Sequence, residues 1–352
     1  MERPNESVKI LNMFLHPVFS VKDSIIVDTN RAAEDLDIQI GTNVTKFIKE
    51  NAEEYASYCG GFLSLTINVS GVSQLATILR SEDRDIFHLL TTDLSAEFRT
   101  MSLVSQQFRK PLSEIMAAVE ARFPQPEDHD DPQVAQINRS LYRLLREVSN
   151  LSSAQRITAQ QAPHLQMHSI SAIIRESLES AQGLVAKSGH ILNFEIPDRD
   201  VESIADSELI ERAIFNLISN AVKFAAENTA VSAKLICVGK SLRFMIQNQV
   251  DEGTDLSNLY ARFMREPGIE DGRHGIGLGI PLVQYIASVH GGTLLMDQPA
   301  ENTVRFTMTL PIRQNSDRVL RAPAITFDYL GGHNHALVEL SDILSAELYN
   351  NI

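Results

Sequence analysis

Residues 83–161 hold no glycine, and their apolar side chains recur every three to four residues. This spacing places the apolar residues on one helix face, so the stretch predicts two long helices. The first is expected from about Arg84 to Arg122, and the proline-rich, acidic sequence FPQPEDHDDP at 123–132 ends it. The apolar positions are Leu90, Leu94, Phe98, Met101, Phe108, Leu112, Ile115 and Val119 in the first helix, and Val134, Ile137, Leu141, Leu144, Val148 and Leu151 in the second.

The alternation of three and four residues is the seam of a coiled coil or of an antiparallel helix bundle. Two helices cannot cover their own seam. A second copy that completes a four-helix bundle is therefore expected. The alternative is that both helices pack only on the flanking domains.

Composition narrows the class of protein. At roughly 100–200 residues per domain, a chain of 352 residues predicts two or three domains. The net charge of −14 argues against a general nucleic-acid binder, which needs clustered Lys and Arg. The two cysteines, Cys59 and Cys237, form neither a disulfide framework nor a metal-ligand spacing. No apolar run approaches the ~18–20 residues of a membrane span, and the first residues lack the apolar core of a signal peptide, so a cytoplasmic protein is expected.

The segments on either side of the helices differ in pattern. Two short apolar runs within 17–30 predict a hairpin, and 62–69 alternates apolar and polar residues as a half-buried strand does. After residue 165, helical and strand patterns alternate, which indicates an α+β sandwich. The expected fold is a multidomain α+β chain, divided into 1–82, the helical hairpin 83–161, 162–313 and a tail 314–352 that ends in a short amphipathic helix.

Two segments of the third domain carry candidate chemistry, and the first is NLISNAVKF at 216–224. Asn216, Asn220 and Lys223 are four and three residues apart, so they share one helix face. Amide oxygens are hard ligands that suit Mg²⁺, and a lysine nearby suits a phosphate oxygen. Such residues also occur on an ordinary solvated helix face.

The second segment is GRHGIGLGIPLVQYIASVHGG at 272–292, in which Gly275, Gly277 and Gly279 precede an apolar helix. Glycines there let backbone N–H groups approach a phosphate closely. The segment is not a Rossmann fingerprint, because no parallel strand leads into it, and it is not a Walker A loop, because no Lys-Ser/Thr follows. The alternative is a surface loop.

Taken together, these segments lie about 55 residues apart, with LYARFMR (259–265) between them. In this order they resemble the N, F and G2 boxes of the sensor histidine kinases, whose GHKL-type (HATPase) ATP-binding domain is shared with gyrase, Hsp90 and MutL. Residues 83–161 resemble the dimerising phosphoacceptor hairpin of that family, and 1–82 resemble a PAS sensor domain. The resemblance implies ATP and Mg²⁺ as ligands and a homodimer, or a heterodimer with another histidine kinase. A response regulator is a further possible partner.

The resemblance also implies roles for residues of this chain. Asn220 would coordinate Mg²⁺ with Asn216 beside it, and Lys223 would contact a phosphate. The lid over the phosphates would be lined by Gly275, Gly277 and Gly279.

One position departs from the family, which usually reads the adenine amino group with an aspartate. Here the region is IQNQVDEGTDLSNLY, and Asn248 is expected at that position. Its amide oxygen would still accept a hydrogen bond, but without charge. Asp251 in that role, or loss of adenine recognition, are the alternatives.

A second departure concerns the phosphorylated histidine. In VSQQFRKPLSEI (104–115), Arg109, Pro111 and Leu112 match the family motif. Gln106 stands at the histidine position and Gln107 at that of the neighbouring acid. Phosphoryl transfer needs a nucleophile, and an amide nitrogen is not one because its lone pair is delocalised.

No other histidine replaces it. His88 lies 18 residues upstream of Gln106, about 27 Å along a continuous helix, and His129, His164 and His168 lack the motif. The resemblance therefore predicts a dimer that binds Mg-ATP and signals by conformation without phosphorylating itself. The alternatives are a kinase that phosphorylates a partner protein, and an ATP-independent adaptor that docks a response regulator or kinase.

Overall fold

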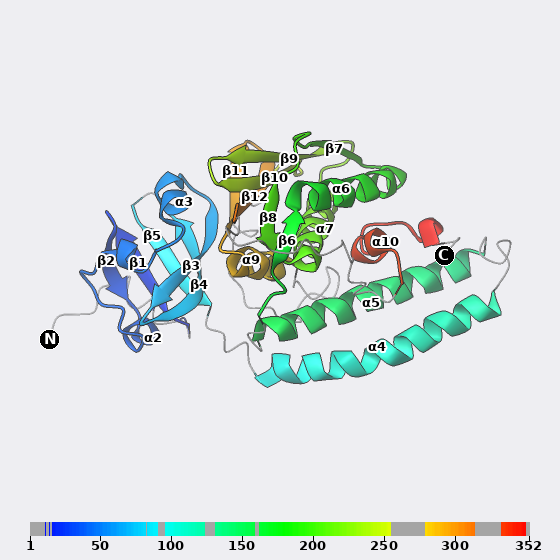
Figure 1. Cartoon of the computed structure of the whole chain (residues 1–352), viewed down its shortest axis with the longest axis horizontal. Helices are drawn as coiled ribbons and strands as arrows, with labels where there is room; N and C mark the ends of the chain where they lie inside the picture. Colours follow the sequence, from blue (N-terminus) through cyan, green and yellow to red (C-terminus); the bar gives the residue numbers. More distant parts are fainter. Residues whose placement is uncertain are drawn as a thin grey trace.

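The computed structural model describes residues 11, 14, 16–81, 83–90, 96–123, 131–158, 162–254, 279–313 and 332–349; within these, the side chains of 90, 96–106, 109 and 153–158 are not described. Figure 1 shows the elements in space. In chain order they are β1 (Val18–Lys22), β2 (Ile25–Thr29), α2 (Arg31–Glu34), η1 (Val44–Lys46), α3 (Ala52–Ser57), β3 (Phe62–Val69), β4 (Val72–Arg80), β5 (Asp85–Leu90), α4 (Ala96–Arg122), α5 (Pro132–Thr158), β6 (Gln166–Ser169), α6 (Ile170–Lys187), β7 (Ile191–Glu195), β8 (Glu202–Ala205), α7 (Ser207–Lys223), β9 (Ala230–Val238), β10 (Ser241–Gln249), α9 (Gly279–Val289), β11 (Thr293–Ala300), β12 (Thr303–Pro311), α10 (His335–Glu339) and η3 (Ala346–Tyr349).

The N-terminal unit is an antiparallel sheet in the order β2-β1-β5-β4-β3, with the short helices α2 and α3 beside it. Its apolar side chains form a core of their own, in which Phe19 stacks on Phe87 with ring centroids 4.8 Å apart. Asn30 caps α2 and also accepts a hydrogen bond from the Val18 N–H, so one buried amide ties the helix to the sheet.

The prediction of a helix from Arg84 is wrong at its start. Residues Asp85–Leu90 form strand β5, which pairs with both β1 and β4, and helix α4 begins at Ala96. A short apolar run fits either period, and the hydrogen bonds available on both edges of β5 decide for a strand. His88 therefore lies in a sheet and not on the helix that carries Gln106. The N-terminal sheet extends to Leu90.

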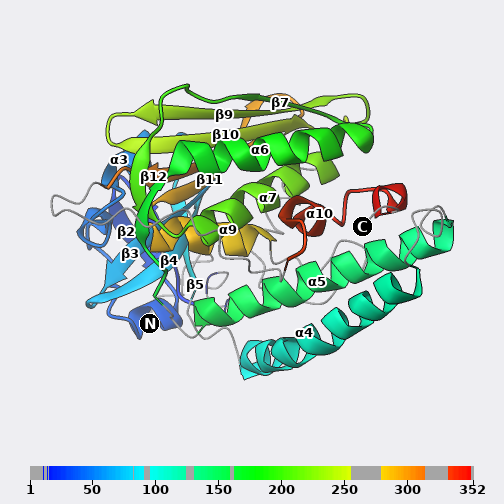
Figure 2. The ribbon, with the colours of Figure 1, turned by 45° about the vertical axis from the view of Figure 1, so that its right-hand side comes forward.

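The second unit is an α/β layer structure. Strands β11, β12, β10, β9 and β7 lie side by side in that order, with β7 parallel to β9. Helices α6, α7 and α9 lie together beside this sheet (Figure 2), and their buried apolar faces share one core with it. Asp206 caps α7, because its carboxylate accepts a hydrogen bond from the Leu209 N–H.

The two sheets are joined. Strand β3 of the N-terminal unit pairs antiparallel with β11, through Ser64 and Leu294, Leu63 and Leu295, and Phe62 and Met296, which makes one ten-stranded sheet. Backbone hydrogen bonds therefore connect the two units directly, in addition to the chain that runs through α4 and α5.

Gly61, immediately before β3, makes this joint possible. Its φ of +87° is a conformation that L side chains rarely adopt, and a Cβ added there would lie 2.2 Å from the Met296 carbonyl oxygen. Gly71 has a nearly identical φ of +86° with nothing within 4 Å of its Cβ position. A side chain would therefore strain the backbone equally at Gly61 and Gly71. Only at Gly61 would it also clash with a neighbouring strand.

We expect Gly61→Ala to destabilise the protein by about 2 kcal/mol more than Gly71→Ala, since the added methyl group must push β3 away from β11. Urea unfolding of both variants measures the difference. Hydrogen exchange should also become faster at the β3 and β11 amides in Gly61→Ala alone. Equal losses in the two variants would show that the joint does not depend on this close approach.

Helices α4 and α5 lie side by side (Figure 1). Helix α4 ends at Arg122 and α5 begins at Pro132, as the breaker sequence predicts, and Pro111 lies inside α4. Leu112, Leu141 and Leu145 are buried in the core shared with the second unit. None of the helices in the described part of the chain combines the length and hydropathy needed to span a bilayer.

Candidate functional site

Helix α7 is fixed at its start by buried polar contacts. The Asp206 carboxylate also accepts a hydrogen bond from the His164 N–H at 2.8 Å, and the Asp206 N–H donates to Nε2 of His290 at 3.0 Å. Nδ1 of His290 lies 2.7 Å from the Ile286 carbonyl oxygen. Burial lowers the pKa of His290, which favours the neutral ring that these bonds require. The end of α9 is thus held against the beginning of α7.

Asn216 connects α7 to the start of α9. The side chain is 3 % exposed, and its Nδ2 donates to the Arg212 carbonyl oxygen at 2.8 Å. This bond orients the amide oxygen toward Gly279, the first residue of α9, where an added Cβ would lie 2.9 Å from Oδ1. The structure therefore brings together two of the predicted site residues, from segments more than sixty positions apart in the sequence.

Asn220 and Lys223 follow on the last turn of α7, and both are half-buried. Nζ of Lys223 lies 3.8 Å from Oδ2 of Asp342, a residue of the C-terminal segment 332–349. Burial lowers the pKa of Lys223, and the Asp342 carboxylate offsets part of that effect. The lysine predicted for a phosphate thus faces a carboxylate of its own chain.

Asn248 lies near the end of β10 and is 4 % exposed. Its Nδ2 donates to the carbonyl oxygens of Phe224 and Gln249, each at 3.2 Å. The side chain therefore links the end of α7 to β10. Asp251, the alternative adenine reader, is exposed in the following turn.

Several predicted residues lie outside the described part of the chain. These are Gly275, Gly277, the 259–265 segment and the side chain of Gln106. Gln107, on α4, is exposed.

A group of charged residues has no counterpart among the sequence predictions. Two arginines, Arg146 of α5 and Arg212 of α7, each place their Nε atom 3.7 Å from the carboxylate of Glu339. Nη1 of Arg146 also lies 2.5 Å from Oδ1 of Asp342. Arg212 and Glu339 are 2 % and 0 % exposed. The sequence did hold a signal for this group: Arg212 lies inside the apolar run LIERAIFNL. An arginine buried on such a helix needs a partner of opposite charge.

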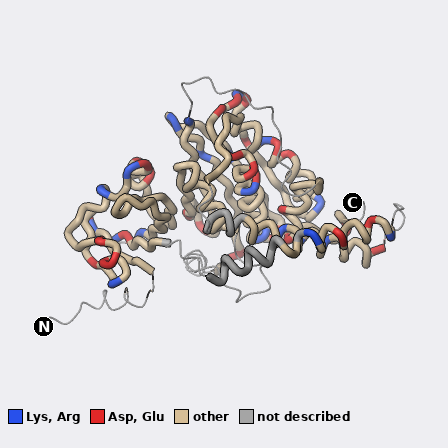
Figure 3. Tube along the Cα trace, turned by 60° about the horizontal axis from the view of Figure 1, so that its bottom comes forward, with Lys and Arg blue, Asp and Glu red and all other residues tan. Residues whose placement is uncertain are grey.

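Direct bonds between α5 and α7 complete this network. Nη2 of Arg146 donates to Oγ of Ser219 at 3.1 Å, and Nη2 of Arg212 donates to Oδ1 of Asn150 at 3.1 Å. Figure 3 shows basic and acidic positions next to one another along the helices near the C-terminal end. Helix α5, the α7 face and the C-terminal segment are therefore one packed, ion-paired unit.

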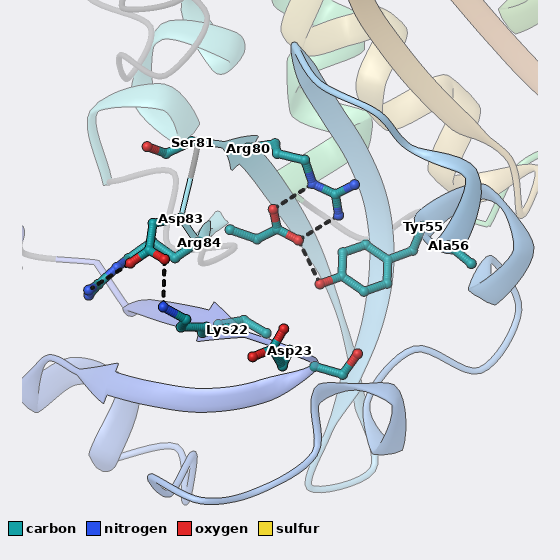
Figure 4. Close-up of a pocket in the computed structure, with 11 residues that line it drawn as sticks. Lys22, Asp23, Tyr55, Ala56, Arg80, Ser81, Asp83 and Arg84 are labelled. Atoms are coloured by element: carbon teal, nitrogen blue, oxygen red, sulfur yellow. Dashed lines mark hydrogen bonds and ion pairs between the residues drawn. The ribbon is translucent and has the colours of Figure 1, made fainter.

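A second candidate site is a surface cavity of about 340 Å³ in the N-terminal unit (Figure 4). The Asp85 carboxylate accepts from both Arg80, at 2.7 Å, and the Tyr55 hydroxyl, at 2.8 Å. Lys22 pairs with Asp83 across its rim. Burial and the Asp85 carboxylate raise the pKa of Tyr55. Arg80 and Asp85, and likewise Lys22 and Asp83, thus hold one another as structural ion pairs do.

Comparison with known proteins relates the second unit to a family of ATPases. Residues 205–314 match the family described as histidine kinase-, DNA gyrase B- and HSP90-like ATPase. The sensor protein KdpD of Clostridium acetobutylicum is 25 % identical over 220 residues, which cover 59 % of this chain and 24 % of that protein. The adaptive-response sensory kinase SasA of Crocosphaera subtropica is 25 % identical over 277 residues, covering 71 % of this chain and 69 % of the kinase.

Among solved structures, full-length ShkA in complex with AMPPNP aligns with a TM-score of 0.48 and 20 % identity, covering 62 % of this chain and 46 % of that one. The chain spans about a quarter of the length of the KdpD relative and about two thirds of that of SasA. Helix α7, which carries Asn216, Asn220 and Lys223, and helix α9, which begins at Gly279, both lie within the matched ATPase domain. Residues 205–314 therefore form a domain of this ATPase family, and the chain as a whole is similar to sensor histidine kinases.

Proposed function

We propose that this protein is a nucleotide-responsive signalling member of the sensor histidine kinase family that does not phosphorylate itself at Gln106. It binds Mg-ATP between α7 and the start of α9, and it transmits the bound state through α4 and α5. The observation that carries the proposal is the contact between the Asn216 amide and the start of α9, inside the matched ATPase domain. A cytoplasmic location and a PAS-like role for the N-terminal sheet belong to the same proposal.

The residues at this place fit a magnesium–nucleotide complex. The Asn216 oxygen is turned away from the Arg212 carbonyl, and the absence of a side chain at Gly279 leaves room beside it. Asn220, one turn further, would supply the second amide oxygen, as oxygen ligands suit Mg²⁺. The metal ion would offset the charge of the phosphates. Lys223 would pair with a phosphate oxygen at the end of the helix.

Adenine would be read at Asn248. Its amide nitrogen is committed to the Phe224 and Gln249 carbonyl oxygens, so the amide oxygen is the atom that would accept from the adenine amino group. Because this acceptor carries no charge, the bond is weaker than the one an aspartate would make. We expect moderate nucleotide affinity.

Dimerisation through α4 and α5 is supported by apolar side chains that remain exposed on both helices. Phe108 and Ile115 on α4 are 57 % and 51 % exposed, and Ile137 and Leu144 on α5 are 44 % and 54 % exposed. The two residues of each pair are seven positions apart, so they occupy the same position in successive heptads. Each helix thus exposes one row of apolar side chains along its seam. A second copy, or another histidine kinase with the same seam, would bury them in a four-helix bundle.

The proposal is tested by incubating the protein with Mg²⁺ and labelled ATP, alone and together with an active histidine kinase or a response regulator. We expect ATP binding and no acid-labile label on this chain alone. Lys223→Ala should bind ATP roughly tenfold more weakly, since a charge-assisted contact to phosphate is lost. Acid-labile label on the isolated chain would contradict the proposal, and label on the added partner would favour the kinase that acts in trans.

We also expect Gly279→Ala to weaken ATP binding about tenfold. The new methyl group must displace the buried Asn216 amide, which cannot move without breaking its bond to the Arg212 carbonyl. Isothermal titration with Mg-ATP measures the loss. Gly183→Ala on α6 is the matched control, because nothing lies within 4 Å of its Cβ position. Equal affinities in the two variants would place the nucleotide elsewhere.

One observation favours the ATP-independent adaptor as a second candidate. Asp342 already lies 3.8 Å from Lys223, so the lysine has an ion-pair partner without a nucleotide. In an adaptor this pair would be purely structural. Failure of the protein and of its Asp342→Asn variant to bind any adenine nucleotide would decide for the adaptor.

A further inference from the structure

The C-terminal segment 332–349 is an integral part of the site region. Figures 1 and 2 both place α10 between α7 and α5. Ala336, Val338, Leu340, Leu344 and Tyr349 are all less than 4 % exposed and belong to the core shared by the helices and the sheet. The Asn138 amide of α5 donates to the Tyr349 carbonyl oxygen at 3.1 Å, which fixes the far end of the segment.

Asp342 is the residue of this segment that reaches the end of α7. Its Oδ1 lies 2.5 Å from Nη1 of Arg146 and accepts from Oγ of Ser219 at 2.9 Å, while Oδ2 lies 3.8 Å from Nζ of Lys223. One carboxylate is thus held by a guanidinium, a hydroxyl and an ammonium group. This is the kind of donor set that also binds a phosphate oxygen.

The carboxylate is ionised in this position. Burial alone would raise the pKa of Asp342, but the Arg146 guanidinium, Lys223 and the Ser219 hydroxyl together hold it below its usual range. A phosphate that approaches Lys223 therefore meets a fixed negative charge about 4 Å from the ammonium group. A phosphate at this ammonium group would repel the Asp342 carboxylate, and this repulsion favours replacement of one anion by the other.

We propose that the C-terminal segment is a built-in competitor for the nucleotide phosphates, with the Asp342 carboxylate occupying Lys223 until ATP displaces it. The inference rests on the ATP binding proposed above. The same segment joins α5 to α7 through Arg146 and Arg212, so its displacement would also loosen the contact between the ATP-binding unit and the helix pair. The two equilibria are linked in both directions. A change that weakens the packing of the segment raises the affinity for the nucleotide, and nucleotide binding weakens the packing of the segment.

The first test is Asp342→Asn, which keeps the size of the side chain and its hydrogen bond with Ser219 but removes the charge. We expect roughly tenfold tighter binding of Mg-ATP, within the usual range of coupling between two sites, and unchanged binding of adenosine, which has no phosphate. Glu347→Gln on the same segment is the matched control, because Glu347 is exposed. It should leave both affinities unchanged.

The second test uses the unmodified protein, so it stands even if Asp342→Asn does not fold. Saturating Mg-ATP should speed hydrogen exchange at the amides of Val338, Leu340 and Ser341 several-fold, and adenosine should not. Protection of these amides by ATP would overturn the inference. A folded Asp342→Asn variant with unchanged ATP affinity, or with an equal gain for adenosine, would overturn it as well. Binding of no nucleotide by either protein would instead overturn the proposed function, and this inference with it.

Discussion

Replacing Glu339 with leucine should reduce the free energy of unfolding by about 3–5 kcal/mol, the largest effect we expect from a single substitution in this chain. Glu339 is fully buried, and its two carboxylate oxygens each lie 3.7 Å from the Nε of a buried arginine, Arg146 on one side and Arg212 on the other. Without the glutamate, Arg212 keeps the Asn150 amide but loses the Glu339 carboxylate. An uncompensated buried guanidinium is costly because the interior solvates it poorly.

Urea or thermal unfolding measures this loss, and Glu347→Leu serves as the control at an exposed position of the same segment. A change at an exposed site should stay within about 0.5 kcal/mol. The double variant Arg212→Met with Glu339→Leu should lose clearly less than the sum of the two single variants, because both charges are then removed together. A loss below about 1 kcal/mol for Glu339→Leu would show that the network contributes little to stability.

Acidification should destabilise the N-terminal sheet through His88. This residue of β5 is 4 % exposed, and burial, with a smaller contribution from His16, lowers its pKa from 6.5 to about 4. In the unfolded chain the imidazole takes up a proton as the pH falls below about 6.5, while the folded protein keeps it neutral down to about 4. The contribution of His88 to the free energy of unfolding is therefore fully present above pH 6.5. About 3 kcal/mol of that free energy is lost between pH 6.5 and pH 4.

His88→Phe should remove this part of the pH dependence, because phenylalanine does not titrate and can keep the edge contact with the His16 ring, whose centroid lies 5.7 Å away. Free energies of unfolding at several pH values between 8 and 4 measure the slope. At pH 8 the variant should remain within about 1.5 kcal/mol of the parent protein. Parallel pH profiles of the two proteins would assign the acid sensitivity to other groups, among them His290.

The sequence anticipated the elements whose signals are local. The strand at 62–69 and the break at 123–132 both follow from periodicity and turn residues within a few positions. The polar face of α7 could also be read in advance, because helix geometry alone brings Asn216, Asn220 and Lys223 to one side. The N-box and G2-box patterns then indicated the ATPase family.

Elements that depend on distant partners were missed or misassigned. Strand β5 was predicted as the start of a helix because the run DIFHLL has no turn signal and fits both periods. The sheet joint at Gly61 could not be predicted either, since its partner Met296 lies more than two hundred positions away. Hydrogen bonds of this kind form only where the edge strands of two sheets meet in the folded chain.

The sequence by itself indicated the ATPase family of residues 205–314 and the polar face of α7, because each is a matter of residue identity and local spacing. Only the tertiary structure decided what Lys223 and Arg212 face. Their partners, Asp342 and Glu339, lie in a tail to which the sequence assigned no role. A buried charge specifies that it needs a counter-charge but not where in the chain that counter-charge is, and only the packing of α5, α7 and the C-terminal segment around one core brings them together.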